Sequence, residues 1–232
     1  MDNITIVYFS DLLYGELTPY ETIKNTFNKI KKLNPDIIIF GGDLFDQNYS
    51  ISKKDYQTIS SLLDSMEAPL GKYAVYGETD LEESHKTKVD DLFFKNNIEI
   101  LDNTSIRVGN RSKKGIRFIG ITNTQDIPKI LESTSSEEFN ILITHQPDSL
   151  LKEEFSLSFI DYALAGHSHS TQITYPILGG YESFLGSQSI NRSHQSPTSF
   201  PYYITSGIGC TNTKFRFNAT PEVCYFVLRK TN

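Results

Sequence analysis

Apolar residues in the first part of the chain alternate between strand-length runs and segments with the period of a helix. Strands are predicted at residues 4–9, 36–40 and 72–76, and helices at residues 20–33 and 54–66. The first helix places Ile23, Phe27, Ile30 and Leu33 on one face, a spacing that indicates packing against a core. The order of these elements predicts a βαβαβ opening.

Strand-length runs dominate the chain after a polar helix predicted at residues 80–97. They lie at residues 98–101, 105–108, 116–121, 140–144, 162–165, 172–175, 202–205 and 223–228. Residues 179–201 are rich in Gly, Ser and Pro, which is typical of a long loop. Strands that alternate with helices and then follow one another predict two sheets packed face to face with helices outside, an α/β (α+β) fold.

The composition is that of an ordinary folded chain. Its 232 residues are 38% hydrophobic and 22% charged, enough to bury a sizeable core, and we expect residues 1–232 to form a single domain. No run approaches the roughly 18 apolar residues of a membrane span, and the first residues lack a signal-peptide pattern. The location stays open: cytoplasmic as the chain is written, membrane-associated or extracytoplasmic if an anchor precedes it.

The charge pattern argues against a nucleic-acid partner. There are 22 basic and 28 acidic residues, a formal net charge of −6, and the basic residues form no stripe or long run. We therefore expect neither DNA nor RNA as a partner. Cys210 and Cys224 are the chain's two cysteines, which provide no disulfide framework and no CxxC metal site, so we expect two buried thiols.

Asp, Glu or His residues, usually beside glycine, follow five of the predicted strands. They are Asp11, the segments GGDLFD (41–46), GETD (77–80) and THQP (144–147), and GHSH (166–169). Any one of them alone is more typical of a turn or a cap. Together, at the carboxyl ends of strands, they predict one crevice that binds a divalent metal. His85 and His194 lie outside the pattern and are interpreted as core or surface residues.

With these five motifs in this order, the chain resembles the calcineurin-like metallophosphoesterase family. The family's signature runs DxH, GDxxD, GNH[D/E], a lone His and GHxH, and the likeness spans Asp11 to His169. The segment GHSHSTQITYP and the tail YYITSGIGCTNTKFRFNATPEV resemble the bacterial phosphodiesterase-like branch. The resemblance implies a four-layer αββα sandwich of two mixed β-sheets flanked by helices.

The resemblance also implies a site for one or two divalent ions. Asp43 would bridge both ions, Asp11 and His169 would bind the first, and His145 and His167 would bind the second. Mn, Fe, Zn and Mg are all compatible with such mixed His and carboxylate ligands.

Three positions depart from the family pattern. Leu13 replaces the histidine of DxH, Glu78 replaces the asparagine of GNH, and Thr79 replaces its histidine. The first ion therefore loses a ligand, whereas the anionic Glu78 is expected to bind the second. Thr79 cannot act as a cationic acid, as the family's histidine does. General acid catalysis of this kind raises the rate about 10²–10⁴-fold, so its loss should slow hydrolysis. Asp46 and Asp80 match outer carboxylates, and we assign them no ligand role.

Two functions follow from this degenerate site. The first is a metal-dependent phosphoesterase that hydrolyses a phosphomonoester or phosphodiester with activated water, acting on a small molecule or a lipid head group. The alternative is a catalytically impaired pseudoenzyme that serves as a binding or scaffold module. We favour a hydrolase, and we name no residue as catalytic.

Tyr14 lies close to Asp11 in sequence and is either a substitute acid or a packed aromatic. Covalent catalysis is not indicated, because there is no GxSxG elbow and no Cys-x₅-Arg loop.

Overall fold

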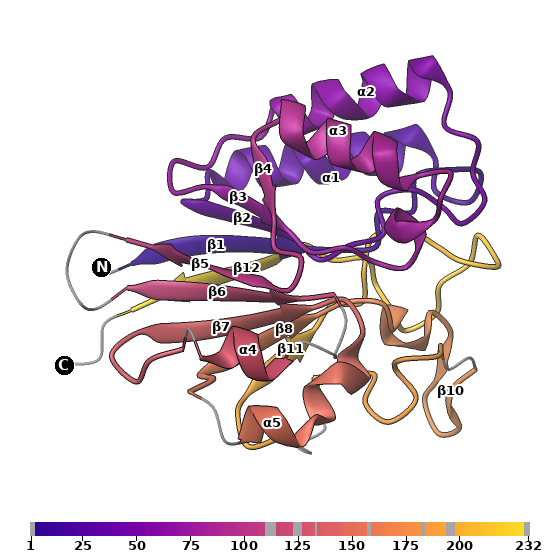
Figure 1. The fold of residues 1–232 in the computed structure, drawn as a ribbon. Coiled ribbons are helices and arrows are strands. Elements are labelled where there is room, and N and C mark those ends of the chain that lie inside the picture. Colours follow the sequence, from indigo (N-terminus) through magenta and orange to yellow (C-terminus); the bar gives the residue numbers. More distant parts are fainter. Residues whose placement is uncertain are drawn as a thin grey trace.

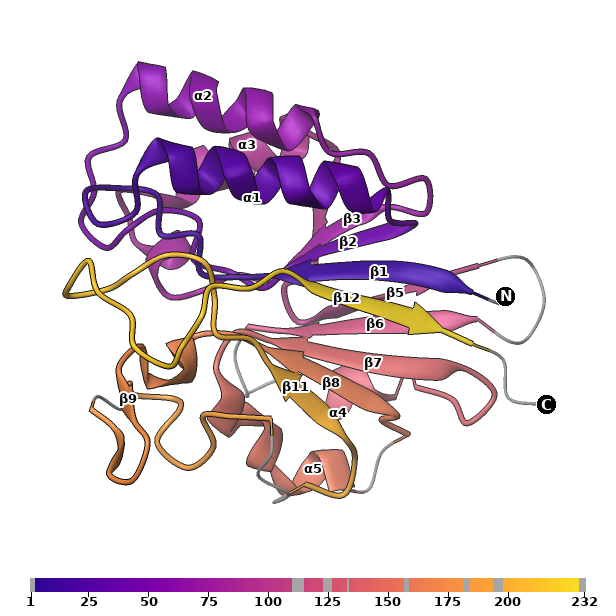
Figure 2. The same cartoon turned by 180° about the vertical axis from the view of Figure 1, so that it is seen from behind.

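Two five-stranded mixed sheets packed face to face form the centre of the protein. The computed structural model describes residues 3–109, 115–122, 127–132, 134–156, 159–181, 184–193 and 198–229. The predicted αββα sandwich is present, with three helices covering one sheet and two short helices covering the other (Figures 1 and 2).

The first sheet has the order β12-β1-β2-β3-β4. Its strands are β1 (Ile4–Phe9), β2 (Ile37–Phe40), β3 (Lys72–Ala74), β4 (Ile98–Ile100) and β12 (Cys224–Leu228). The strands β1 to β4 are parallel, as the βαβαβ opening requires, and β12 pairs antiparallel with β1. The chain's last strand therefore lies beside its first.

The second sheet has the order β11-β8-β7-β6-β5. Its strands are β5 (Thr104–Val108), β6 (Ile116–Ile121), β7 (Phe139–Thr144), β8 (Tyr162–Ala165) and β11 (Tyr202–Ile204). All pair in parallel except β5, which is antiparallel to β6. A small hairpin of β9 (Thr174–Tyr175) and β10 (Gly179–Gly180) follows β8.

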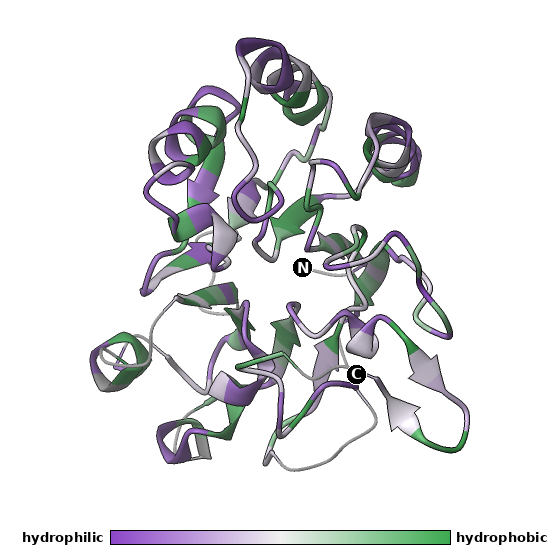
Figure 3. Ribbon diagram, turned by 90° about the vertical axis from the view of Figure 1, so that its right-hand side faces the viewer, coloured by the Kyte–Doolittle hydropathy of each residue, from purple (hydrophilic) through white to green (hydrophobic). Residues whose placement is uncertain are grey.

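The helices turn apolar faces towards the sheets. On the first sheet lie α1 (Tyr20–Leu33), α2 (Lys53–Asp64) and α3 (Lys86–Lys95); on the second lie α4 (Ile127–Leu131) and α5 (Glu153–Ser156). Figure 3 shows this amphipathic pattern, with hydrophilic colour on the outer sides of the larger helices. Three buried apolar clusters result: one under each helical layer and one between the sheets, around residues such as Tyr8, Ile39 and Phe118.

Two predicted elements differ from the structure. The helix predicted at residues 80–97 begins only at Lys86, because residues Thr79–Leu81 form a 3₁₀ turn (η1) that the buried Asp80 carboxylate ties to neighbouring loops. The strand predicted at 172–175 is confined to Thr174–Tyr175, since Gln172 adopts a left-handed backbone with φ of 48°. Two further 3₁₀ turns, η2 (Pro147–Leu151) and η3 (His169–Thr171), follow β7 and β8.

Candidate metal centre

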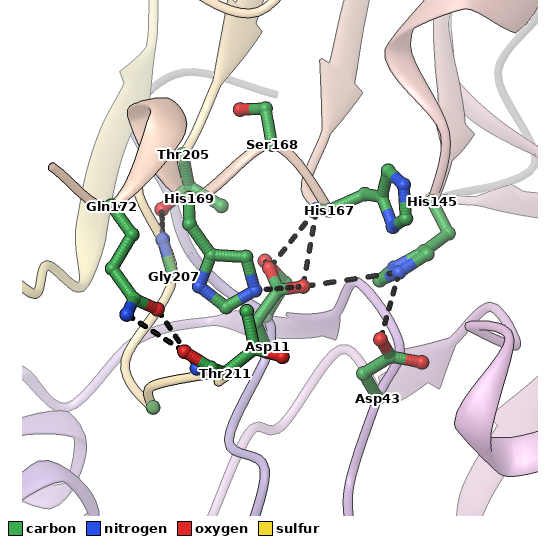
Figure 4. Close-up of polar contacts among 12 residues, drawn as sticks. Asp11, Asp43, His145, His167, Ser168, His169, Gln172, Thr205, Gly207 and Thr211 are labelled. Atoms are coloured by element: carbon green, nitrogen blue, oxygen red, sulfur yellow. Dashed lines mark hydrogen bonds and ion pairs between the residues drawn. The ribbon is translucent and has the colours of Figure 1, made fainter. Parts of the chain in front are cut away.

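The carboxyl ends of parallel strands from both sheets meet at one edge of the sandwich. Asp11 follows β1, Asp43 follows β2, His145 follows β7, and His167 and His169 follow β8. All five side chains are buried, and Figure 4 shows them converging. The expectation that the polar strand ends share one crevice is met for these five residues.

Sharp backbone turns aim these side chains inward. Asp11, Asp43, His167 and His169 have φ values of 53°, 62°, 63° and 49°, in the left-handed region that non-glycine residues rarely adopt. Such a conformation changes the direction of the chain sharply at a single residue, here two to four residues past the strand ends. The side chains of these residues converge in Figure 4.

Asp43, His145 and His167 form the tightest group of metal-binding atoms among the described residues. One atom from each lies within 4.8 Å of the others. The Nε2 atom of His145 is 3.2 Å from Asp43 Oδ2, yet it is buried without a hydrogen-bond partner. Buried polar atoms are normally satisfied, so this one points to a ligand that the protein atoms do not supply.

Each of these two histidines has a carbonyl oxygen behind it. His145 Nδ1 donates to Gly41 O at 2.7 Å, and His167 Nε2 donates to Leu185 O at 2.7 Å. Those contacts occupy one nitrogen of each ring and leave His145 Nε2 and His167 Nδ1 facing the crevice, where each carries a lone pair when its ring is neutral. A carbonyl acceptor behind the ring is the usual arrangement for a histidine that binds metal. Together with a carboxylate oxygen of Asp43, these nitrogens are donors that fit a divalent metal ion.

The carboxylate of Asp43 is held by the loop after β3. Thr79 donates from its backbone nitrogen and its hydroxyl to Asp43 Oδ1, at 2.9 and 3.0 Å. Asp80 accepts from the backbone nitrogens of Asp43, Leu44 and Gly77 at 2.8–2.9 Å. Thr79 thus positions Asp43, a role that the sequence did not reveal. The Asp80 carboxylate faces these three backbone donors, and its lack of a ligand role stays a prediction.

Glu78 lies at the rim of the site. Its side chain is half exposed, its Oε2 is 3.7 Å from His167 Nδ1, and its Oε1 accepts a hydrogen bond from Gln146 Nε2. The carboxylate is near enough to take part, and its role as a ligand stays a prediction. Gln146 belongs to the THQP segment, but its contact with Glu78 became apparent only in the structure.

Asp11 accepts hydrogen bonds that fix its carboxylate between the histidines. The His167 backbone nitrogen donates to both of its oxygens at 3.1 Å, and Ser10 Oγ donates to Oδ2. Asp11 Oδ1 lies 3.8 Å from His145 Nε2 and 3.6 Å from His169 Nε2 (Figure 4). Asp11 therefore borders the Asp43 group on the side of His169.

His169 has a cation behind it. Arg216 Nη2 donates to His169 Nδ1 at 2.9 Å. Leu13, at the position of the family's missing histidine, is buried and apolar. No sequence signal singled out Arg216, because it lies 47 residues from His169 and the resemblance of the tail marks no single position in it as functional.

The charges of the site are strongly coupled. Burial raises the pKa of Asp43, but the His145 imidazolium outweighs it and lowers the pKa to about 2. Burial lowers the pKa of His145, but Asp43 and Asp11 outweigh it and raise the pKa to about 10. In the metal-free protein these two groups form a buried ion pair. Burial, reinforced by Arg216, holds the pKa of His169 well below its usual range.

Several residues discussed in the sequence lie outside the site. Tyr14 donates to Asp55 Oδ1 at 2.9 Å, and burial together with Asp55 raises its pKa to about 12, so it is a packed aromatic and not a substitute acid. His85 is buried with ring nitrogens near two backbone carbonyls, as interpreted from the sequence. Both cysteines are free; Cys224 is buried as expected, but Cys210 is only partly so. His194 lies outside the described residues.

Comparison with known proteins identifies the family to which the chain belongs. The family model described as calcineurin-like phosphoesterase matches residues 4–171. The chain belongs to this family, and its general class is that of a metal-dependent hydrolase of phosphoester bonds. It is 27% identical over 238 residues to the uncharacterized metallophosphoesterase YkuE of Bacillus subtilis, covering 100% of this chain and 81% of that protein.

Two further similarities are more distant. A transmembrane protein with metallophosphoesterase domain from Danio rerio is 23% identical over 99% of this chain, which spans only 54% of that longer protein. A solved structure described as a novel phosphatase from Mycoplasma pneumoniae has a TM-score of 0.48 and 12% identity, covering 90% of this chain and 73% of that one. None of the helices in the described part of this chain is long and apolar enough to cross a membrane.

Proposed function

We propose that Asp43, His145 and His167 bind a divalent ion with which the protein hydrolyses a phosphomonoester or phosphodiester. The observation that carries this proposal is the buried, unpartnered His145 Nε2 that faces the Asp43 carboxylate. Glu78 is the fourth ligand in this proposal, because its carboxylate reaches the same ring of His167. The ion is Mn, Fe, Zn or Mg, with Mn²⁺ the first choice for assay.

The protein's own residues would orient this chemistry. An ion bound here supplies a Lewis acid that polarises a phosphoryl oxygen and makes water nucleophilic at neutral pH. Thr79 fixes the Asp43 carboxylate, and the Gly41 carbonyl keeps the His145 proton on Nδ1. The Thr79 hydroxyl is engaged with Asp43 Oδ1 and cannot serve as a strong acid for the leaving group.

Substrates with good leaving groups should therefore react best. A leaving group of low pKa departs as an anion without a proton donor, whereas a poor one depends on general acid catalysis worth about 10²–10⁴-fold. We propose a small phosphoester or a lipid head group as the substrate class and no nucleic acid, in keeping with the net charge of −6. We also propose that residues 1–232 form one domain, and that membrane association depends on any additional segment.

A pseudoenzyme is the second candidate. It is favoured by Leu13, which is apolar where the family has a ligand, and by Thr79, which is occupied in holding Asp43. In this role the bound ion would stabilise a binding or scaffold surface.

An activity assay separates the two candidates. The wild type with Mn²⁺ should slowly hydrolyse an activated aryl phosphodiester, and Asp43→Ala should abolish that rate. The double variant Leu13→His with Thr79→His should raise the rate, most of all for unactivated substrates. Activity that survives Asp43→Ala would come from a contaminant and remove support for the proposal. An inactive wild type rescued by the two histidines would establish the pseudoenzyme.

A further inference from the structure

Arg216 is fully engaged around His169. Its Nε donates to Gly209 O at 2.9 Å, its Nη1 to Ser206 O and Ala219 O at 2.7 and 3.1 Å, and its Nη2 to Gly209 O and to His169 Nδ1. These bonds account for the five N–H groups that a guanidinium carries. The cation is thus locked in place by backbone carbonyls and has one bond left, which goes to the histidine.

This contact determines which nitrogen of His169 carries the proton. A guanidinium only donates, so His169 Nδ1 must accept and cannot carry a proton. The proton of the neutral ring then sits on Nε2, the atom that faces Asp11 Oδ1 at 3.6 Å. A histidine that binds metal through Nε2 needs a lone pair there and a proton on Nδ1.

The other two histidines have the opposite arrangement. Behind His145 and His167 lies a carbonyl that accepts a hydrogen bond from the N–H of the outer nitrogen, so the inner nitrogen is the one that can bind metal. Behind His169 lies a donor. His169 is therefore the one member of the three whose hydrogen bonding opposes metal binding.

Leu13 provides an independent observation on the same side of the site. It is 3% exposed and lies against the segment that Arg216 holds, since a Cβ added at Gly209 would be 2.8 Å from Leu13 Cβ. The position where a fourth imidazole would face the first ion is thus apolar and packed. Two of the groups that a first ion needs, at positions 13 and 169, are unsuited to it.

We propose that the protein binds a single ion, at the Asp43 group, and that His169 acts as a hydrogen-bond donor fixed by Arg216. At 3.6 Å, Asp11 is too distant to take up the Nε2–H fully. That N–H can donate to a phosphoryl oxygen of the substrate in place of the missing ion. Arg216 is a positioning residue in this arrangement. The inference rests on the metal centre proposed above.

Metal titration of histidine variants provides the first test. His169→Ala and His169→Asn should bind Mn²⁺ with a Kd within about threefold of wild type, with one ion per chain. Asn keeps an acceptor for Arg216 and suits the left-handed backbone at this position, so it controls for folding. His167→Ala should weaken binding by at least the roughly 10–100-fold that loss of an outer partner costs.

The outcomes are distinguishable. Two ions per wild-type chain, or His169 variants as weak as His167→Ala, would overturn the inference and leave the metal centre standing. Unchanged affinity in all three variants would remove the metal centre and the inference together.

Nitrogen-15 NMR of the histidine rings provides a second test that does not depend on activity. The His169 proton should be on Nε2 both without metal and with saturating Zn²⁺, whereas His145 keeps its proton on Nδ1 in the zinc form. Arg216→Met removes the donor, so the two His169 tautomers should become mixed. A His169 proton that moves to Nδ1 on zinc addition would identify the ring as a ligand and refute the proposal.

Discussion

Gly77→Ala tests the position of the Asp43 carboxylate without changing any proposed ligand. A Cβ at residue 77 would lie 2.1 Å from Asp43 Oδ1 and 2.6 Å from Asp43 N. Ordinary contact begins near 3.4 Å, so the carboxylate has to move by about 1.3 Å, the difference between 3.4 and 2.1 Å. Gly77 has no left-handed φ, and the substitution therefore adds no backbone strain.

The displacement is large compared with what a metal site tolerates. Metal–ligand distances are fixed to within about 0.2 Å. In catalytic sites a misplacement of about 1 Å can lower the rate on the order of 100-fold, and we expect a loss of metal affinity of similar size. The same movement disrupts the two hydrogen bonds from Thr79 to Asp43 Oδ1. We expect Mn²⁺ affinity to fall at least about 100-fold, or about 2.7 kcal/mol. The overpacking should lower the free energy of unfolding of the metal-free protein by about 1–3 kcal/mol.

Calorimetric titration with Mn²⁺ and urea unfolding of the metal-free protein measure these two effects. Gly115→Ala is the matched control, because the three atoms nearest to its Cβ would belong to the Arg107 guanidinium, at 3.0 Å, and residue 115 precedes β6 at the opposite end of the sheet from His145. The control should bind Mn²⁺ like wild type. If a folded Gly77→Ala variant also binds like wild type, Asp43 Oδ1 is not held where the ion binds, and the argument from its position is wrong.

Further predictions concern Glu78 and pH. Glu78→Gln keeps the size of the side chain and removes its charge, so Mn²⁺ affinity should fall. Glu82→Gln on the neighbouring turn is the control. Unchanged Mn²⁺ affinity in Glu78→Gln would mean that Glu78 is a surface carboxylate and not a ligand. The His145 pKa of about 10 exceeds its unfolded value of about 6.5, so its contribution to the stability of the metal-free protein is complete below about pH 6.5 and is lost as the pH rises towards 10. Metal binding must displace this proton, so affinity should rise about tenfold per pH unit from about pH 7 to 9. Urea midpoints and titrations at these pH values measure both effects, and a flat affinity profile would contradict the ion pair. The low Asp43 pKa acts in the opposite window: its contribution is present above about pH 3.8 and is lost as the pH falls through 2.

Strand positions could be predicted because each strand is a short apolar run bounded by polar residues. The start of the helix predicted at residues 80–97 could not be predicted, since the inward turn at Asp80 depends on the backbone donors of Asp43 and Leu44. These donors are about 36 residues away in sequence. Helical periodicity carries no information about such a contact. The same limit applies to all elements whose ends are set by buried polar groups.

The site could be predicted as a set of residues but not as a set of roles. Strand-end Asp and His residues are visible in the sequence, and the structure brings them together. The sequence shows Thr79 only as a position where the family has a histidine, whereas in the structure Thr79 donates two hydrogen bonds to Asp43. The proton position on His169 depends on Arg216, whose placement follows from the packing of the tail and from no local pattern.

The left-handed backbone at Asp11, Asp43, His167 and His169 has a consequence for how the site persists. Each such residue costs on the order of 1 kcal/mol, a cost that glycine at the same position avoids. These conformations last only where surrounding packing over-determines them, so the site is already assembled before any ligand arrives. A ligand that binds there would therefore not have to order these four residues. The packing of the surrounding fold offsets their backbone strain.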